Sequence, residues 1–156
     1  MNVITAQQFE KLLPLAVEWA AEQERSILQS GAPLSEPQLA DARQVGVLSP
    51  ERVRLLQVAQ IPVPKDPALA AAAAGTRLIS PSTGGMTFRY GIFIRSDCWG
   101  RRSLVAHELV HVTQYERLGS LEAFLRPYLM ECIWPPFYPN GPMEQEAVKV
   151  SGRLCV

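Results

Sequence analysis

The sequence predicts an α+β fold in which a small mixed sheet packs on a central helix, with a further helix close to the C-terminus. Short apolar runs with the alternation of β-strands occupy the middle of the chain, and helical patterns lie on either side of them. Residues 104–112 are apolar nearly all round except at His107, Glu108 and His111. A helix of that kind is buried on most of its sides, which a covering sheet can provide.

The bulk composition indicates one folded domain over residues 1–156, with an N-terminal helical segment over 1–50 and a core over 51–156. Apolar residues make up 47% of the chain and charged residues 19%, which excludes a disordered protein. The 15 basic and 15 acidic side chains leave no net charge, so the basic excess of a nucleic-acid binder is missing. We expect no nucleic-acid partner, and the oligomeric state stays open.

Cellular location is predicted from what the sequence lacks. No segment approaches the roughly 20 consecutive apolar residues of a membrane-spanning helix, and residues 1–5 lack the features of a signal peptide. We expect a cytoplasmic protein without a membrane partner, with leaderless export as the alternative. The cysteines at 98, 132 and 155 imply no disulfide framework and suit a reducing compartment. For Cys98, a small half-buried residue is favoured over a thiolate ligand to a metal.

The first helix is predicted from about Ala6 to Leu28, with Thr5 as its N-cap and Gly31 as its stop. Pro14 should kink or break it. The favoured interpretation places this helix on the back of the core, and the alternative makes it a pro-segment across a cleft. A short second helix is expected around residues 35–45.

The middle of the chain predicts strands and one helix. Val53–Val58 alternates as a strand does, and Asp66–Gly75 is an alanine-rich helix with an acidic cap, an early proline and a closing glycine. Thr76–Ile79 and Met86–Tyr90 flank a turn-rich loop, and Tyr90–Arg95 has a strand pattern. Three short strands are therefore expected before the histidine helix. They can bury its apolar back, formed by Val105, Leu109 and Val112.

The histidine helix should begin around residues 100–103 and end at Gly119. Ser120 caps a following helix, which Pro127 interrupts. Residues 134–141 are too rich in proline for regular structure, and they form either an aromatic loop near the site or a lid on the core. The last helix runs over residues 142–151.

The motif that carries chemistry is His107-Glu108-Leu109-Val110-His111. Histidines four residues apart project from one face of a helix, where both imidazoles can bind one zinc ion. The glutamate between them can move a proton on a zinc-bound water, which is the H-E-x-x-H pattern of zinc metallopeptidases. These are the only two histidines of the chain.

A catalytic zinc ion needs a third protein ligand. No histidine is left, so we expect a carboxylate rather than a thiolate. Glu144 and Glu146 of the last helix are the candidates. Both lie about equally far from the apolar stripe of that helix, so its amphipathic pattern does not separate them.

The histidine motif followed by a glutamate on a later helix resembles the gluzincin metallopeptidases. The chain's small size and its close on the glutamate helix resemble the minimal gluzincins. The resemblance covers roughly residues 76–152 and implies a zincin-like fold, with Glu144 as the third zinc ligand at the start of an E-x-x-A-D-like stretch. Val148 stands where the family has an aspartate that supports a zinc-binding histidine. The support of the histidines is therefore unassigned.

The resemblance further implies a zinc-dependent metalloendopeptidase acting on a peptide or protein. Glu108 is then the general base, and Tyr90–Arg95 is the edge strand that pairs with an extended substrate. The oxyanion is assigned to Tyr115, Tyr128, Tyr138 or an arginine. Two alternatives stay open: a zincin-fold interaction module that binds zinc without proteolysis, and a metal-free helical domain.

Overall fold

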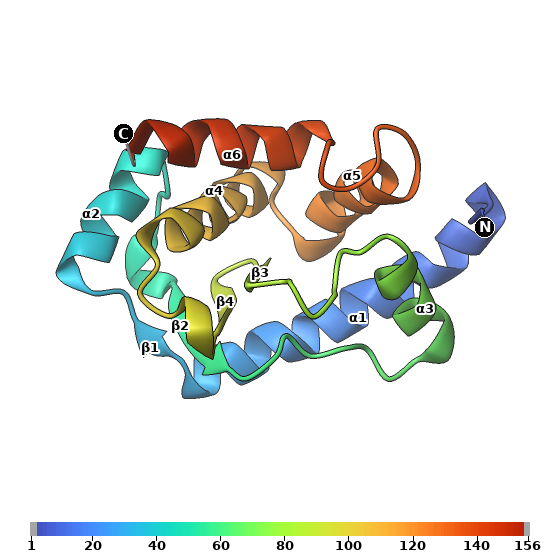
Figure 1. The fold of residues 1–156 in the computed structure, drawn as a ribbon, viewed down its shortest axis with the longest axis horizontal. Coiled ribbons are helices and arrows are strands. Elements are labelled where there is room, and N and C mark those ends of the chain that lie inside the picture. The colour runs from blue at the N-terminus through green and yellow to red at the C-terminus, as the bar shows by residue number, and fades with distance from the viewer. Residues whose placement is uncertain (1–2, 155–156) are drawn as a thin grey trace.

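The computed structural model describes residues 3–154, which form six α-helices and a four-stranded mixed sheet (Figure 1). The helices are α1 (Ala6–Ser30), α2 (Glu36–Val45), α3 (Pro67–Gly75), α4 (Arg102–Leu118), α5 (Leu121–Ile133) and α6 (Pro142–Leu154). The strands are β1 (Ala32–Pro33), β2 (Arg54–Val58), β3 (Gly85–Phe88) and β4 (Gly91–Arg95). The predicted α+β class with a small mixed sheet is confirmed. Within residues 3–154, no helix has the length and apolar character needed to cross a membrane.

The sheet has the strand order β1-β2-β4-β3. β2 and β4 are parallel, while β1 and β3 pair antiparallel with their neighbours. The expectation that Tyr90–Arg95 forms the edge is therefore wrong, because β4 lies inside the sheet. A two-residue turn at Arg89-Tyr90 joins β3 to β4, so β3 pairs on the side of β4 that β2 leaves open and becomes the edge strand.

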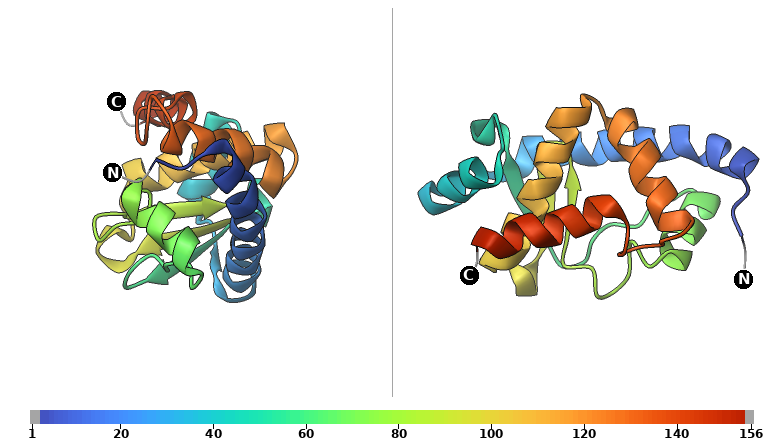
Figure 2. Two further views of the ribbon diagram at one scale, coloured as in Figure 1. Left: turned by 90° about the vertical axis from the view of Figure 1, so that its right-hand side faces the viewer. Right: turned by 90° about the horizontal axis from the view of Figure 1, so that it is seen from above.

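The sheet lies between two helical layers, with α4 and α6 on one side and α1 on the other (Figures 1 and 2). Ile92 and Ile94 of β4 are fully buried in one apolar cluster, and the back of α4 lies in the same cluster through Val105, Leu109 and Val112. The predicted burial of that helix face by the sheet is confirmed. The opposite face of the sheet packs on α1, where Phe93 belongs to a second cluster with Phe9 and Leu13.

Helix α1 begins with a capping box between Thr5 and Gln8. It runs without a break through Pro14, which is exposed, while its neighbours Leu13 and Ala16 are buried against the core. Packing of the buried residues on both sides of the proline holds the two halves in one helix. Helix α5 likewise continues through Pro127.

Other differences from the sequence-based expectation are small. Residues 76–79 form turns. Strand β1 was not predicted, because a strand of two residues is too short to show an alternating pattern. Short 3₁₀ helices at Pro50–Arg52 and Ser96–Cys98 precede β2 and α4. Helix α6 continues past Gly152 to Leu154. Cys155 lies outside the described residues.

Candidate metal centre

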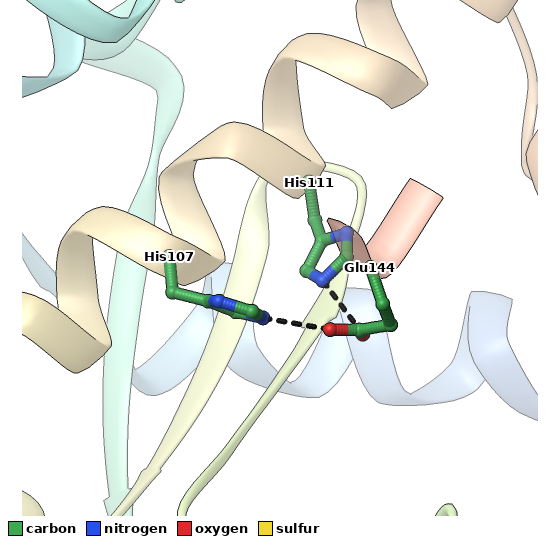
Figure 3. Close-up of side chains that lie close together, drawn as sticks. All are labelled: His107, His111 and Glu144. Atoms are coloured by element: carbon green, nitrogen blue, oxygen red, sulfur yellow. Dashed lines mark hydrogen bonds and ion pairs between the residues drawn. The ribbon is translucent and has the colours of Figure 1, made fainter. Parts of the chain in front are cut away.

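His107, His111 and Glu144 point toward one another, the two histidines from α4 and the glutamate from α6 (Figure 3). The Nε2 atom of His107 lies 2.9 Å from Oε2 of Glu144, and Nε2 of His111 lies 3.0 Å from Oε1. One ligand atom from each residue can be chosen so that all three lie within 4.8 Å of one another. Two imidazole nitrogens and one carboxylate are the donor set of a catalytic zinc site, so these residues fit a metal ion.

Glu144 reaches the histidines because of how α6 begins. The carboxylate of Glu131, at the end of α5, accepts a hydrogen bond from the backbone N–H of Met143 at 3.1 Å. The approach is close: a Cβ atom at Gly141 would lie 2.7 Å from the Glu131 side chain, so only glycine fits there. The first N–H groups of a helix have no partner within the helix, so the negative charge of Glu131 stabilises the N-terminus of α6. These contacts set the first turn of α6, on which Glu144 lies.

A second contact fixes the other ring nitrogen of His111. Its Nδ1 lies 2.8 Å from Oε1 of Gln114, which is fully buried three residues further along α4. The Gln114 amide nitrogen donates to the Met143 carbonyl at 2.9 Å and to the Glu146 carboxylate at 2.7 Å. Both partners only accept hydrogen bonds, so the amide oxygen must face His111. His111 therefore carries a proton on Nδ1. Without a metal ion its Nε2 donates a hydrogen bond to Glu144, and loss of that Nε2 proton would free the lone pair for a metal ion.

Glu146, the alternative third ligand, belongs to this support instead of to the metal group. Its Oε1 atom accepts hydrogen bonds from Gln114 and from Arg117, the latter at 2.9 Å. The bond from Gln114, joined by the one from Arg117, lowers the pKa of Glu146. Its carboxylate is thus kept as an acceptor for the amide.

The charges of the cluster favour an ionised carboxylate. Burial raises the pKa of Glu144, but hydrogen bonds from His107 and His111 outweigh it and hold the pKa well below its usual range. Burial lowers the pKa of His111, but the bond to Glu144 and the nearby charge of Glu108 raise it to about 9. The Tyr128 hydroxyl donates to Glu144 at 2.6 Å. A metal ion that binds here takes the place of a proton between two of its ligands.

Glu108 lies beside this cluster against the edge strand. Its Oε1 accepts a hydrogen bond from the Thr87 hydroxyl at 2.8 Å, and its side chain is only slightly exposed. A Cβ atom at Gly85 would lie 3.1 Å from the Glu108 side chain, so the absence of a side chain at Gly85 lets β3 approach. The carboxylate is therefore held in place from the strand side.

The metal cluster and Glu108 line a cavity of about 130 Å³. Met86 and Phe88 of the edge strand also line it, and so do apolar side chains of α1, α3 and α5. Helix α1 thus covers the back face of the sheet and, with side chains between Phe9 and Ala20, lines this cavity. Tyr138 of the proline-rich loop lines the cavity too, which brings that loop next to the site.

Several residues that the sequence suggested for the site lie outside the metal group. Cys98 is buried next to Arg95 and Asp97 and is not part of the metal group. The Tyr115 hydroxyl donates to the Thr87 carbonyl at 3.3 Å. Val148, in the position of the family's aspartate, is 53% exposed.

Sequence reasoning missed Gln114, Thr87 and the bond from Tyr128 to Glu144. Gln114 had a readable signal, because a polar side chain three residues after His111 shares its helical face. Thr87 and Tyr128 reach the site from separate elements, and no spacing relates them to the motif.

Comparison of the chain with protein-family models, with curated proteins and with solved structures found no match. The resemblance to the gluzincins is therefore carried by His107, Glu108, His111 and Glu144.

Proposed function

We propose that the protein is a zinc-dependent metallopeptidase of gluzincin type with a zincin-like fold. The observation that supports it most is the cluster of His107, His111 and Glu144, which lines a cavity together with Glu108. The sheet has an antiparallel edge strand next to the histidine helix, and the glutamate comes from a later helix.

His107, His111 and Glu144 would hold the ion. A zinc ion there supplies Lewis acidity, which polarises a carbonyl oxygen and makes a water molecule a stronger acid. The metal is assigned as zinc because two histidines and a glutamate leave one position open for substrate or water.

Glu108 is the general base. Its carboxylate accepts a proton from water as the water oxygen bonds to the scissile carbonyl carbon, and it returns that proton to the amine as the C–N bond breaks. The Thr87 hydroxyl orients the carboxylate from the edge strand. Gln114 and Tyr128 orient His111 and Glu144.

Tyr138 is the tyrosine we assign to the oxyanion. The hydroxyls of Tyr115 and Tyr128 donate to Thr87 and Glu144, and no arginine lines the cavity within the described residues. Burial raises the pKa of Tyr138, so its hydroxyl keeps its proton and can donate a hydrogen bond at neutral pH.

The peptide or protein substrate meets the edge strand at β3. The Gly84 carbonyl accepts a hydrogen bond from the backbone N–H of Arg95 in β4. Because hydrogen-bonded pairs alternate with non-bonded pairs along antiparallel strands, the backbone N–H and C=O of the next residue, Gly85, face away from the sheet. The outward carbonyl of Thr87 is taken by Tyr115. The backbone of Gly85 is therefore the proposed point of pairing with an extended peptide.

The first test is zinc per chain by elemental analysis. We expect about one zinc in the parent and in Glu146→Ala, because Glu146 lies outside the metal group, and a large loss in Glu144→Ala. Absence of zinc from all samples, even when zinc is supplied during purification, would overturn the assignment.

The second test is cleavage of a denatured protein mixture by the zinc-loaded chain, compared with Glu108→Gln. The amide cannot accept the proton, so cleavage should fall by a factor on the order of 10² to 10⁴ while zinc stays bound. Zinc bound without cleavage in the parent would favour the interaction module that binds zinc without proteolysis.

A further inference from the structure

Residues 59–84 form one long connection between β2 and β3, and we call this segment the strap (Figure 1). Helix α3 is its only helix, with irregular chain on both sides. Pro64, Ala72 and Ile79 are among the strap residues that line the cavity of the metal cluster. The strap therefore forms one wall of that cavity.

Polar contacts do not tie most of the strap to the rest of the protein. Within the part of the chain that the structure describes, the hydrogen bonds of residues 60–80 all join them to residues 66–83 and so stay inside the strap. Its charged residues Lys65, Asp66 and Arg77 form no ion pair there. The strap is therefore held over the cavity mainly by apolar contacts.

Those apolar contacts are concentrated toward the ends of the strap. Ile61 and Ile79 are buried in the large apolar cluster, whereas α3 between them contains no buried residue, although it consists only of proline, alanine, leucine and glycine. Where the strap meets α1, Trp19, Pro64 and Leu69 line the metal cavity and also a surface groove of about 450 Å³. Side chains with empty space beside them lose contacts on that side, so this junction is loosely packed.

The other walls of the cavity are joined to their neighbours by polar contacts. Glu24 of α1 accepts hydrogen bonds from Arg89, and β3 pairs with β4. Tyr128 of α5 donates to Glu144 of α6. Local opening takes place where buried apolar contacts and hydrogen bonds to the rest of the protein are few. The strap is the wall with the fewest of both.

One side chain fastens the C-terminal end of the strap. The Arg95 guanidinium, at the end of β4, donates to the backbone carbonyls of Pro81 and Thr83, the latter at 3.3 Å. Its Nε atom donates to Asp97 at 2.6 Å, which fixes the orientation of the guanidinium. Arg95 thus joins the strap to the sheet without contact to the metal cluster.

A peptide bond cleaved at the metal cluster must reach groups that the structure keeps buried, since Glu108 is 5% exposed, His111 4% and Glu144 7%. We propose that the strap is a lid on the metal cluster, which lifts to admit the substrate and which Arg95 holds shut. The exposed residues 59, 60 and 82 lie at its two ends and provide the hinges. The role in substrate entry rests on the proposed function, whereas the opening of the strap does not require hydrolysis.

The first measurement is hydrogen exchange of the zinc-free protein, followed by mass spectrometry. A helix of nine residues is not stable alone in water, so the α3 amides exchange whenever the strap lifts. They should exchange at least about 100-fold faster than those of α5, which needs global unfolding. Arg95→Gln should speed α3 exchange about tenfold further. The matched control is Arg126→Gln, which removes an arginine–carboxylate contact between α1 and α5 and should leave α3 unchanged.

Equal protection of α3 and α5 in the parent would show that the strap opens only with the whole protein, and this result overturns the lid. Equal α3 exchange in folded Arg95→Gln and Arg126→Gln overturns the role of Arg95. The comparison within the parent needs no variant.

The second measurement follows zinc release from the zinc-loaded protein to excess EDTA, and zinc uptake by the zinc-free protein. No strap residue that lines the cavity is a histidine, cysteine, aspartate or glutamate. Opening should therefore change the rates and leave the affinity as it is. Arg95→Gln should speed release and uptake by the same severalfold factor, at unchanged Kd. Unchanged rates, or a weaker affinity at an unchanged uptake rate, would refute the lid. If the parent binds no zinc, the metal assignment fails, and the exchange result alone decides whether the strap opens.

Discussion

Removal of the Gln114 amide tests how the proposed zinc site is preorganised. In Gln114→Leu the side chain keeps a similar size but becomes apolar, so the Nδ1–H group of His111 and the Met143 carbonyl lose their partners. Because Gln114 is fully buried, no water replaces it directly. Loss of such an outer contact to a metal-binding histidine weakens metal binding by about 10- to 100-fold, or about 1.4–2.8 kcal/mol.

An exchange of the Gln114 amide and the Glu146 carboxylate separates the orientation of His111 from the packing around it. Gln114→Glu alone puts a second carboxylate against Glu146 and the Met143 carbonyl, so it should weaken zinc binding as well. In the double variant Gln114→Glu with Glu146→Gln, a carboxylate oxygen at position 114 still accepts the hydrogen bond from His111. The new amide at position 146 can donate to the other oxygen of that carboxylate, which reverses the direction of the original bond between the two positions. The double variant should regain part of the lost affinity, because the Met143 carbonyl still faces a carboxylate, whereas Glu146→Gln alone should bind zinc nearly as the parent does.

The assay is competition for zinc with a chromophoric chelator, with the folding of each zinc-free variant checked by circular dichroism. The chain has two histidines, so ring ¹⁵N spectra of the zinc-loaded protein contain two imidazoles that can be assigned by substitution. His111 should carry its proton on Nδ1 in the parent. A Gln114→Leu variant that is folded and binds zinc as tightly as the parent would refute the reasoning.

Three further predictions concern the frame around the site. Glu24→Ala removes a buried carboxylate that accepts bonds from Arg89 and from the backbone of Tyr90; it should cost about 2 kcal/mol and lower Tm by roughly 4–8 °C in calorimetry, while exposed Glu22→Ala should change little. Gly85→Ala should slow cleavage severalfold by displacing the Glu108 side chain, whereas Gly75→Ala, with open space around its Cβ, should not; equal rates in both would contradict the fit. Burial raises the pKa of Cys132 to about 12, so iodoacetamide at pH 8 should alkylate this thiol only after denaturant is added, as peptide mass mapping will show.

The local features of the fold were readable in the sequence. Thr5, Asp66 and Ser120 cap their helices as predicted, because capping depends on a few consecutive residues. The apolar back of α4 was also predicted, since the spacing of Val105, Leu109 and Val112 is a property of one helix. The shared helical face of His107 and His111 was predictable for the same reason, because it depends on their spacing along one helix.

Relations between separate elements were decided by tertiary structure. The position of β4 inside the sheet depends on which side of it β2 and β3 occupy, and a strand pattern does not encode its neighbours. The helices that continue through Pro14 and Pro127 do so because packing on both sides outweighs the local cost of proline.

The candidate metal centre likewise combines residues that the sequence relates within one helix with residues that tertiary structure brings together. The sequence by itself placed His107, Glu108 and His111 on one helical turn and offered Glu144 and Glu146 as the candidates for a third metal ligand. On the helical wheel these two were equivalent. The docking of α6 on α4 separates them, because it brings Glu144 to within 3.0 Å of both imidazoles and leaves Glu146 on Gln114 and Arg117. Contacts of this kind depend on the angle and depth at which two helices meet, which the packing of the whole chain sets.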